Sequence, residues 1–326
     1  MPGLTVPGQM RTGNDAERAM MQNVRIGVSL RSGYGALEPR AAARRMIERT
    51  RAARAAGLDS LFVGDHHVTG STYLQNSPIL GRLLAEWGDR TAGALFLLPL
   101  WHPVLVAEQV ATLAALAEGP FVLQVGLGDG ETQFAGMGAS LSRRARAVEA
   151  SIDVIRRLLA GETVDADDPV TIRQARIGPL PPEPVAMWIG AGADKGIARA
   201  ARLGDGWIAG PWVPLDRART QADLYLERRA AHGRGQGVVA IRRDLHVGAD
   251  AADAHRVADP VLAAGYRGLP PDAPVLGGPE EVAEAFLGLA GLGYTDVLVR
   301  HLADDQDEVL ASLARLAEVG DLVRRA

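Results

Sequence analysis

Short apolar runs alternate with longer amphipathic segments along most of the chain. The runs are rich in Val, Ile, Leu and Phe and are too short for helices, which is typical of buried strands. We expect eight strands, at 24–30, 60–64, 91–99, 121–126, 185–190, 206–209, 238–247 and 296–300. Apolar residues recur at helical spacing between them. We expect helices at 40–56, 76–87, 103–116, 141–159, 197–203, 216–231, 280–292 and 305–319.

Strands and helices alternate without a break that would mark a second core. This order indicates the α/β class, with either a closed parallel barrel or a doubly wound sheet. Glycines and polar side chains stand just beyond most strand ends, and only a barrel gathers all such positions around one mouth. We therefore predict a single-domain (β/α)8 TIM barrel. The Pro- and Asp-rich segment 161–184 is predicted to be an insertion loop.

The second expected strand runs out into Asp65, His66 and His67. Side chains alternate along a strand, so the two histidines are expected to face opposite ways, one toward a ligand and the other into packing. His66 is a candidate acid/base or cofactor-orienting group, and the competing interpretation is a packed core histidine. A zinc site made from the three residues is less favoured, because adjacent residues rarely ligate one ion.

Two glycine-rich strand exits are candidates for ligand binding. Residues 188–196 read WIGAGADKG, so a strand, glycines and a helix start follow one another, an arrangement that presents backbone N–H groups to a phosphate. Lys195 replaces the third glycine of a dinucleotide fingerprint, so the motif is not a clean Rossmann signature. Residues 126–130 read GLGDG, and their glycines allow close approach to a flat ring. Either motif alone is compatible with a simple tight turn.

Composition excludes several classes of function. There are 0 cysteines, so disulfides, thiolate metal sites and thiol nucleophiles are ruled out. The net charge is −4 and no basic run carries interleaved aromatics, which argues against a nucleic-acid partner. The longest apolar run, 92–101, is interrupted by Pro99 and is too short to span a bilayer. Residues 1–23 lack a signal-peptide block and are expected to form a flexible arm. We expect a cytoplasmic protein with a small-molecule substrate and no membrane partner.

Five stretches between about 24 and 299, in this order, resemble the luciferase-like monooxygenase superfamily, whose members are flavin- or deazaflavin-dependent barrel enzymes. They are GLDSLFVGDHH, LFLLPLWHPVLVAEQVATLAAL, FVLQVGLGDGETQFAGMG followed by RRARAVEASIDVIRRLLAGE, WIGAGADKGIARAARLGDGWI, and GGPEEVAEAFLGLAGLGYTDVLV.

The resemblance implies that residues 24–326 form a barrel domain holding a non-covalent flavin or deazaflavin. His66 would match the family's active-site histidine, with Asp65 beside it as in many deazaflavin users, and we take both as catalytic candidates. The cofactor-binding candidates are Gly128, Asp129 and Glu131 beside the cofactor's side chain, and Gly190, Ala191, Gly192 and Ala193 around its phosphate. The family often has a non-proline cis peptide, which would fall within 94–97. We also expect a homodimer and no metal.

Two departures from the family pattern bear on the cofactor and the substrate. Leu127 stands where FMN users often carry a phosphate-binding Arg, which tilts the choice toward coenzyme F420. Trp101 replaces another frequent Arg and leaves the substrate contacts open; together with Trp188 and Trp212 it would wall the pocket, unless these residues are core. The expected reaction is hydride transfer with F420 or monooxygenation with reduced FMN. The alternatives are a non-catalytic flavin-binding relative and a metal-dependent barrel hydrolase.

Overall fold

A closed barrel of eight parallel strands is formed within residues 24–270 and 273–326, which are the residues that the computed structural model describes. Around the barrel the order is β1 (Arg25–Leu30), β2 (Ser60–Val63), β3 (Thr91–Leu97), β4 (Phe121–Gly126), β7 (Ala186–Gly190), β8 (Gly206–Ala209), β9 (Val238–Val247) and β11 (Asp296–His301). β9 pairs with both β8 and β11, and β11 pairs with β1, which closes the ring. The barrel is confirmed over the doubly wound sheet.

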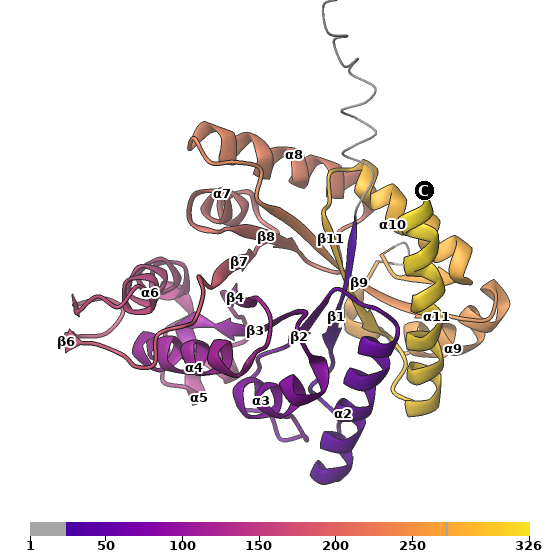
Figure 1. Ribbon diagram of the computed structural model, residues 1–326, viewed down its shortest axis with the longest axis horizontal. Coiled ribbons are helices and arrows are strands. Elements are labelled where there is room, and N and C mark those ends of the chain that lie inside the picture. Colours follow the sequence, from indigo (N-terminus) through magenta and orange to yellow (C-terminus); the bar gives the residue numbers. More distant parts are fainter. Residues whose placement is uncertain (1–23, 271–272) are drawn as a thin grey trace, which may run out of the picture.

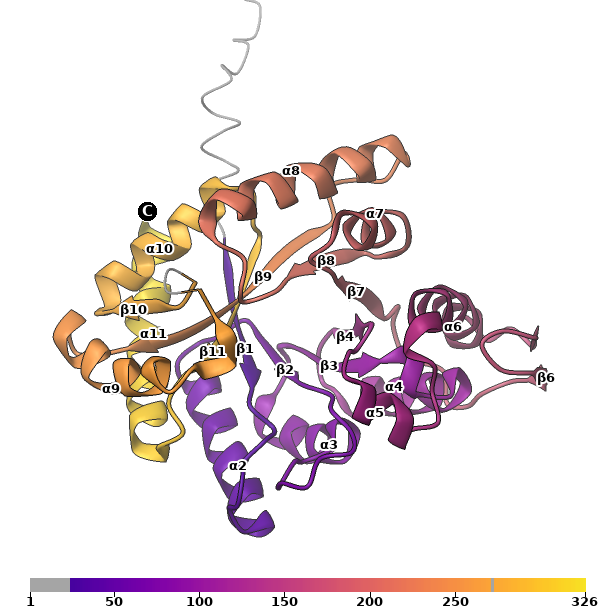
Figure 2. The ribbon, with the colours of Figure 1, turned by 180° about the vertical axis from the view of Figure 1, so that it is seen from behind.

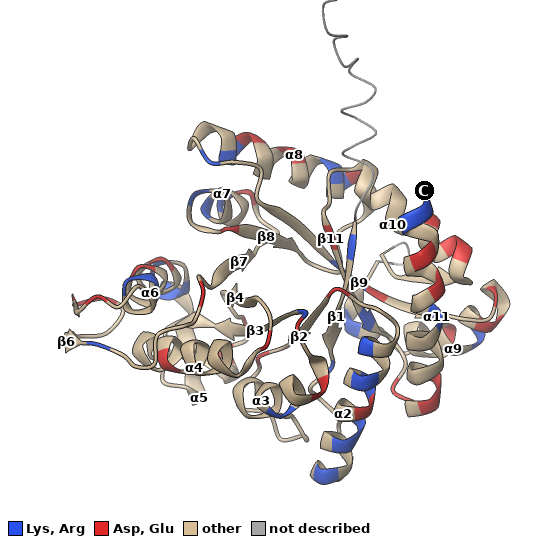
Figure 3. Ribbon diagram, viewed as in Figure 1, with Lys and Arg blue, Asp and Glu red and all other residues tan. Residues whose placement is uncertain are grey.

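Helices surround these strands, as the two opposite views in Figures 1 and 2 show. They are α2 (Pro39–Ala55), α3 (Asn76–Trp87), α4 (Pro103–Leu116), α6 (Arg144–Leu159), α7 (Asp194–Leu203), α8 (Leu215–Ala231), α10 (Pro279–Gly291) and α11 (Gln306–Arg325). In α2 the buried positions Ala42, Met46 and Ala53 share one face, because residues three and four apart align on a helix. Arginines occupy many of the other positions along α2 (Figure 3).

The interior of the barrel is closed by an apolar plug. Its members are Phe62, Val122, Trp188, Ala240 and Leu298, which pack together from five different strands. Phe62 and Trp188 have ring centroids 5.4 Å apart. Trp188 is 4% exposed and therefore belongs to the core. Any ligand at the carboxyl ends of the strands must lie above this plug.

The segment 161–184 holds more structure than the expected loop. It contains an antiparallel hairpin of β5 (Val164–Ala166) and β6 (Ile172–Ala175), which projects beside α6 in Figure 1. Three further elements were also not predicted, namely α5 (Glu131–Gly136), α9 (Ala251–Ala263) and β10 (Val275–Gly277). α9 contains Pro260 and has only two buried residues, and β10 is three residues long, so neither carries a clear periodic signal.

The expected non-proline cis peptide within 94–97 was wrong. The described chain has cis bonds at Asp168–Pro169 and Gly178–Pro179, both in the insertion and both preceding proline. At the end of β3 the backbone is trans, and in this conformation the Leu97 N–H already donates a hydrogen bond to the Asp65 carboxylate, 2.8 Å away. A cis bond there would cost several kcal/mol without gaining a partner. The predicted arm at 1–23 lies outside the described residues.

His301, at the end of β11, makes the fold sensitive to acid. The residue is 6% exposed and its Nε2 has no hydrogen-bond partner within the described structure. Burial lowers the pKa of His301 to about 3, and the positive charge of Arg49 and the nearby His246 act in the same direction. Between pH 6.5 and about 3, the unfolded chain therefore binds a proton that the folded chain does not.

We expect the free energy of unfolding to fall as pH drops through this window. From about pH 7 to about pH 4.5 the wild type should lose on the order of 2 kcal/mol more than His301→Gln does. Urea denaturation at the two pH values measures the difference. His255→Gln, at an exposed position paired with Asp259, is the control and should behave like the wild type. Equal losses in the wild type and His301→Gln would contradict the assignment.

Candidate functional site

Asp65 joins the loops that follow β2 and β3. Its side chain is fully buried. Oδ2 accepts hydrogen bonds from the Leu97 N–H and from the Trp101 Nε1–H, both at 2.8 Å. Oδ1 lies 3.1 Å from His67 Nε2. Each oxygen thus faces a protein group, and the residue fixes the backbone from which the two histidines project.

The side chains of His66 and His67 lie in different environments, as the alternation of side chains along a strand predicts. The His67 side chain is 11% exposed, and its ring meets the edge of the Trp101 ring at a centroid distance of 5.3 Å. The His66 ring is exposed and lies 5.7 Å from the Tyr73 ring. Burial raises the pKa of Tyr73 to about 12, so its phenol stays neutral at physiological pH. Of the two histidines, His66 is the one open to a ligand.

Gln133 holds the glycine-rich loop after β4 against the histidine loop. It is 5% exposed, its Oε1 accepts from the His67 N–H at 2.8 Å, and its Nε2 donates to the Asp129 carbonyl at 3.0 Å. Gly128 and Gly130 have φ values of +67° and +83°, which side chains rarely adopt. Asp129 and Glu131 are exposed. Gln133 and Tyr73 were missed by sequence reasoning, since neither stands next to a strand end.

The turn 190–193 leads from β7 into α7, and two of its carbonyl groups accept hydrogen bonds from side chains. Trp207 Nε1 donates to the Ala191 carbonyl at 2.8 Å, and Gln221 Nε2 donates to the Gly192 carbonyl at 2.9 Å. The backbone N–H groups of 192–195 donate to no backbone acceptor in the described structure. A helix N-terminus with free N–H groups attracts anions. A Cβ on Gly192 would meet nothing nearer than Trp212 Nε1, at 3.8 Å.

The predicted site residues lie at one end of the barrel. β4 and β7 are neighbours, with Val125 paired to Ile189, so their two glycine turns lie side by side. Gln133 ties the first turn to the loop that carries His66. The structure therefore brings together His66, the loop 128–131 and the turn 190–193.

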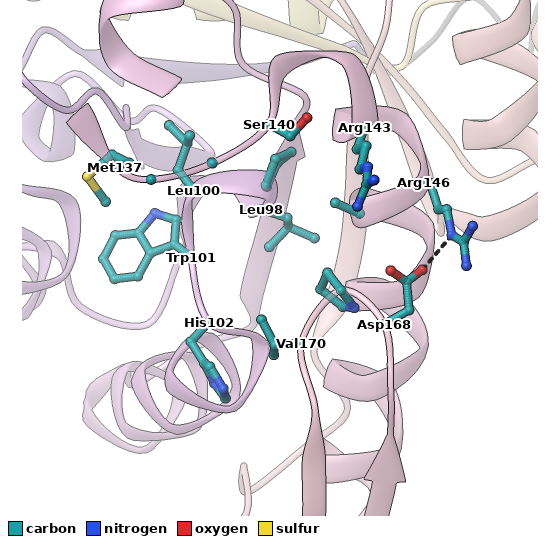
Figure 4. Close-up of a pocket in the computed structure, with 15 residues that line it drawn as sticks. Leu98, Leu100, Trp101, His102, Met137, Ser140, Arg143, Arg146, Asp168 and Val170 are labelled. Atoms are coloured by element: carbon teal, nitrogen blue, oxygen red, sulfur yellow. Dashed lines mark hydrogen bonds and ion pairs between the residues drawn. The ribbon is translucent and has the colours of Figure 1, made fainter. Parts of the chain in front are cut away.

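A cleft of about 640 Å³ lies beside Trp101, the residue that donates to Asp65 (Figure 4). Trp101 lines it together with Ser140 and Arg143, and Arg146 at its edge forms a 2.8 Å ion pair with Asp168 of the insertion. Trp101 therefore walls this cleft while it binds Asp65. Trp212 is 53% exposed near the turn 190–193 and is also available to a ligand.

Two findings concern other classes of site. Within 24–270 and 273–326, no three His, Asp or Glu side chains are grouped so as to hold a metal ion. Across the same residues, no helix combines the length and apolar character needed to cross a bilayer.

We expect Asp65→Ala to destabilise the protein by about 3 kcal/mol, because two buried donors lose their acceptor. Asp65→Asn should cost less, since the amide oxygen still accepts from Leu97 and Trp101 and the amide nitrogen can donate to His67. Urea denaturation of both variants measures the order. If Asp65→Asn were as damaging as Asp65→Ala, the negative charge rather than the hydrogen bonds would be what the site requires.

A family model described as luciferase-like monooxygenase matches residues 24–322. The chain is 30% identical to the F420-dependent glucose-6-phosphate dehydrogenase of Beutenbergia cavernae, in an alignment that covers 89% of this chain and 96% of that protein.

Two solved structures show the same fold. An F420-dependent secondary alcohol dehydrogenase in complex with an F420–acetone adduct is 18% identical, with a TM-score of 0.75 over 93% of this chain and 99% of that chain. The second is a type II Baeyer–Villiger monooxygenase from Pseudomonas putida in complex with FMN, the oxygenating constituent of 3,6-diketocamphane monooxygenase. It is 15% identical, with a TM-score of 0.75 over 93% of this chain and 98% of that chain.

Proposed function

Because this chain belongs to the luciferase-like monooxygenase family, we propose that it is an oxidoreductase that binds coenzyme F420 or FMN at the carboxyl ends of the barrel strands. The observation that carries the proposal is the convergence of three loops on one mouth. His66 projects from the first, the second contains Gly128, and the third is the turn 190–193.

The residues present fit a phosphate-bearing ring cofactor. The turn 190–193 offers N–H groups at the start of α7, with Lys195 exposed beside them, and this suits a phosphate. The positive φ angles of Gly128 and Gly130 keep the loop after β4 free of side chains where a ring or ribityl chain would pass. We propose that Asp129 and Glu131, which are exposed on this loop, bind the polar part of the cofactor.

F420 is the better supported cofactor. Leu127 packs against the core, so the loop after β4 places no cation at this position for an FMN phosphate. A relative that aligns over most of both chains is an F420-dependent enzyme. F420 supplies hydride transfer, whereas reduced FMN supplies oxygen activation. We therefore favour hydride transfer with a small organic substrate over monooxygenation.

Within this reaction the chain's own residues have distinct tasks. Oxidation of an alcohol by hydride loss also releases the hydroxyl proton, and the exposed imidazole of His66 is placed to accept it. Asp65 is fully buried, so we assign it a positioning role, in which it holds the loop that carries His66. The hydrogen-bonded Trp101 and the exposed Trp212 would flank the ligand. A homodimer and a cytoplasmic location stay predictions, and sedimentation velocity would test the first.

Turnover experiments separate this proposal from a non-catalytic flavin-binding relative. The purified protein is mixed, without oxygen, with oxidised F420 and a panel of alcohols, some of which also carry a carboxylate or phosphate group, and reduction of the coenzyme is followed by absorbance. We expect reduction with at least one alcohol and no oxygen requirement. Reduction with none, together with an oxygenated product when reduced FMN and oxygen are supplied, would favour the monooxygenase. Turnover in neither assay would favour the non-catalytic relative.

A further inference from the structure

Two arginines project into the barrel directly above the apolar plug. Arg242 stands two residues beyond Ala240 on β9, and Arg300 stands two residues beyond Leu298 on β11. Side chains two residues apart lie on the same face of a strand, so both arginines share the interior face with the plug. A guanidinium is a costly group to place inside a barrel unless its charge is compensated.

One carboxylate serves both cations. Arg242 Nε donates to Asp244 Oδ1 at 2.9 Å, and the Tyr266 hydroxyl donates to Asp244 Oδ2 at 2.9 Å. Asp244 is completely buried and stands opposite Arg300 in the register of β9 and β11. Arg300 itself donates to the Ser29 carbonyl at 3.2 Å and to Ser29 Oγ at 2.9 Å. Its hydrogen-bond acceptors in the described structure are therefore neutral, and positive charge is left over.

The environment inside the barrel lowers the pKa of both Arg242 and Arg300. Burial, together with repulsion from Arg300, lowers the pKa of Arg242 to about 9. Burial also lowers the pKa of Arg300, and the exposed Arg267 acts on both residues in the same direction. Arginine remains protonated at neutral pH, so the positive charge stays in the barrel. The Arg242 side chain nevertheless keeps 16% of its surface exposed, which means that solvent reaches it.

A chain of neighbouring residues connects these arginines to His66. A Cβ added to Gly64 would lie 3.6 Å from Arg300 Nη2 and 3.3 Å from the Tyr73 hydroxyl. The Tyr73 ring is in turn 5.7 Å from the His66 ring. The contacts therefore run from the cationic pair, past a residue without a side chain, to the histidine at the strand end.

We propose that Arg242 and Arg300 bind an anionic group of the substrate, so that the enzyme acts on small organic acids or phosphate esters rather than on neutral alcohols. The Nη1 groups of both arginines make no hydrogen bond within the described residues. Guanidinium N–H groups match the spacing of carboxylate and phosphate oxygens, which accept them two at a time. This inference rests on the proposed function and names the substrate class of the same site.

Anion binding to the cofactor-free protein tests the proposal, with acetate and inorganic phosphate as separate probes in isothermal titration calorimetry. We expect one of the two to bind, and the tighter one indicates whether substrates carry a carboxylate or a phosphate. Arg300→Gln should weaken that binding by about tenfold or more, because a charge-assisted bidentate contact is lost. Asp244→Asn should strengthen it, since the competing carboxylate is removed. Arg82→Gln, on the outer surface and paired with Glu86, should change nothing.

Circular dichroism checks that each variant is folded, and Arg242→Gln replaces Arg300→Gln if the latter does not fold. A merely structural role would not make the arginine and aspartate variants move affinity in opposite directions. Binding that is unchanged by both arginine variants, or lost only when Gly192 is replaced, would place the anion at the turn 190–193 and overturn the proposal. F420 affinity is measured separately, so a protein that binds F420 but no anion refutes this inference alone.

Discussion

Replacing His66 by alanine is expected to lower kcat by about 10²- to 10⁴-fold, the usual contribution of a positioned acid/base group. The dissociation constant for F420 should change by less than about threefold, which is under 1 kcal/mol. The reason is geometric: His66 is exposed at the end of β2, whereas the turn 190–193 and the loop after β4 supply most of the cofactor contacts that we propose. Steady-state kinetics and fluorescence titration measure the two quantities separately.

His102→Asn is the matched control for this experiment. His102 is another exposed histidine beyond a strand end, and its Nδ1 accepts from the Val104 N–H at 3.3 Å as the cap of α4. Asparagine is also a good helix cap, so fold and activity should persist. If His66→Ala kept near-normal turnover, or if His102→Asn lost as much, the role assigned to His66 would be wrong.

Gly192→Asp is expected to weaken F420 binding by about 10- to 100-fold, the equivalent of one or two charge-assisted hydrogen bonds. The new side chain would bring bulk and negative charge to the N–H groups that we propose for the phosphate. Its Cβ would have no protein neighbour closer than Trp212 Nε1 at 3.8 Å, so the fold should tolerate it. Fluorescence titration gives the affinity, and thermal melting checks that stability is kept.

Gly288→Asp serves as the comparison, because Gly288 is exposed on α10 and a Cβ there meets nothing within 4 Å. It adds the same charge far from the strand ends and should leave F420 affinity unchanged. An equal loss of affinity in both variants would point to a general effect of charge. If neither variant lost F420 affinity, the proposal that the turn 190–193 binds the phosphate would be wrong.

The fold was predictable where strands are apolar and bounded by glycine or polar residues. The strands at Phe121–Gly126, Gly206–Ala209 and Val238–Val247 have the predicted bounds. The repeated order of strand and helix left a closed barrel and a doubly wound sheet open, and the polar and glycine-rich strand ends favoured the barrel, because only a barrel gathers them around a common mouth. His66 and the two glycine turns became candidates for the same reason, since each directly follows such a strand.

The features that were not predicted depend on partners distant in sequence. Gln133 is recognisable as a link only once the loops after β2 and β4 lie side by side. Asp65 was expected to be catalytic from its place beside His66, yet its carboxylate is enclosed by the loop after β3. The sequence did contain one signal for charged groups inside the barrel, where Arg242 and Arg300 lie. Arg242 and Asp244 share one face of a strand in a parallel barrel, where both faces are normally apolar.

Equilibrium binding of F420 and of FMN to the purified protein tests most directly whether the strand-end loops form one cofactor site. We expect F420 to bind with a dissociation constant on the order of micromolar, and FMN to bind at least about tenfold more weakly because Leu127 supplies no cation. Binding of F420 should also be weakened by Gly192→Asp and retained in His66→Ala. If neither cofactor bound the folded protein, the functional account would be contradicted even though the barrel is correct.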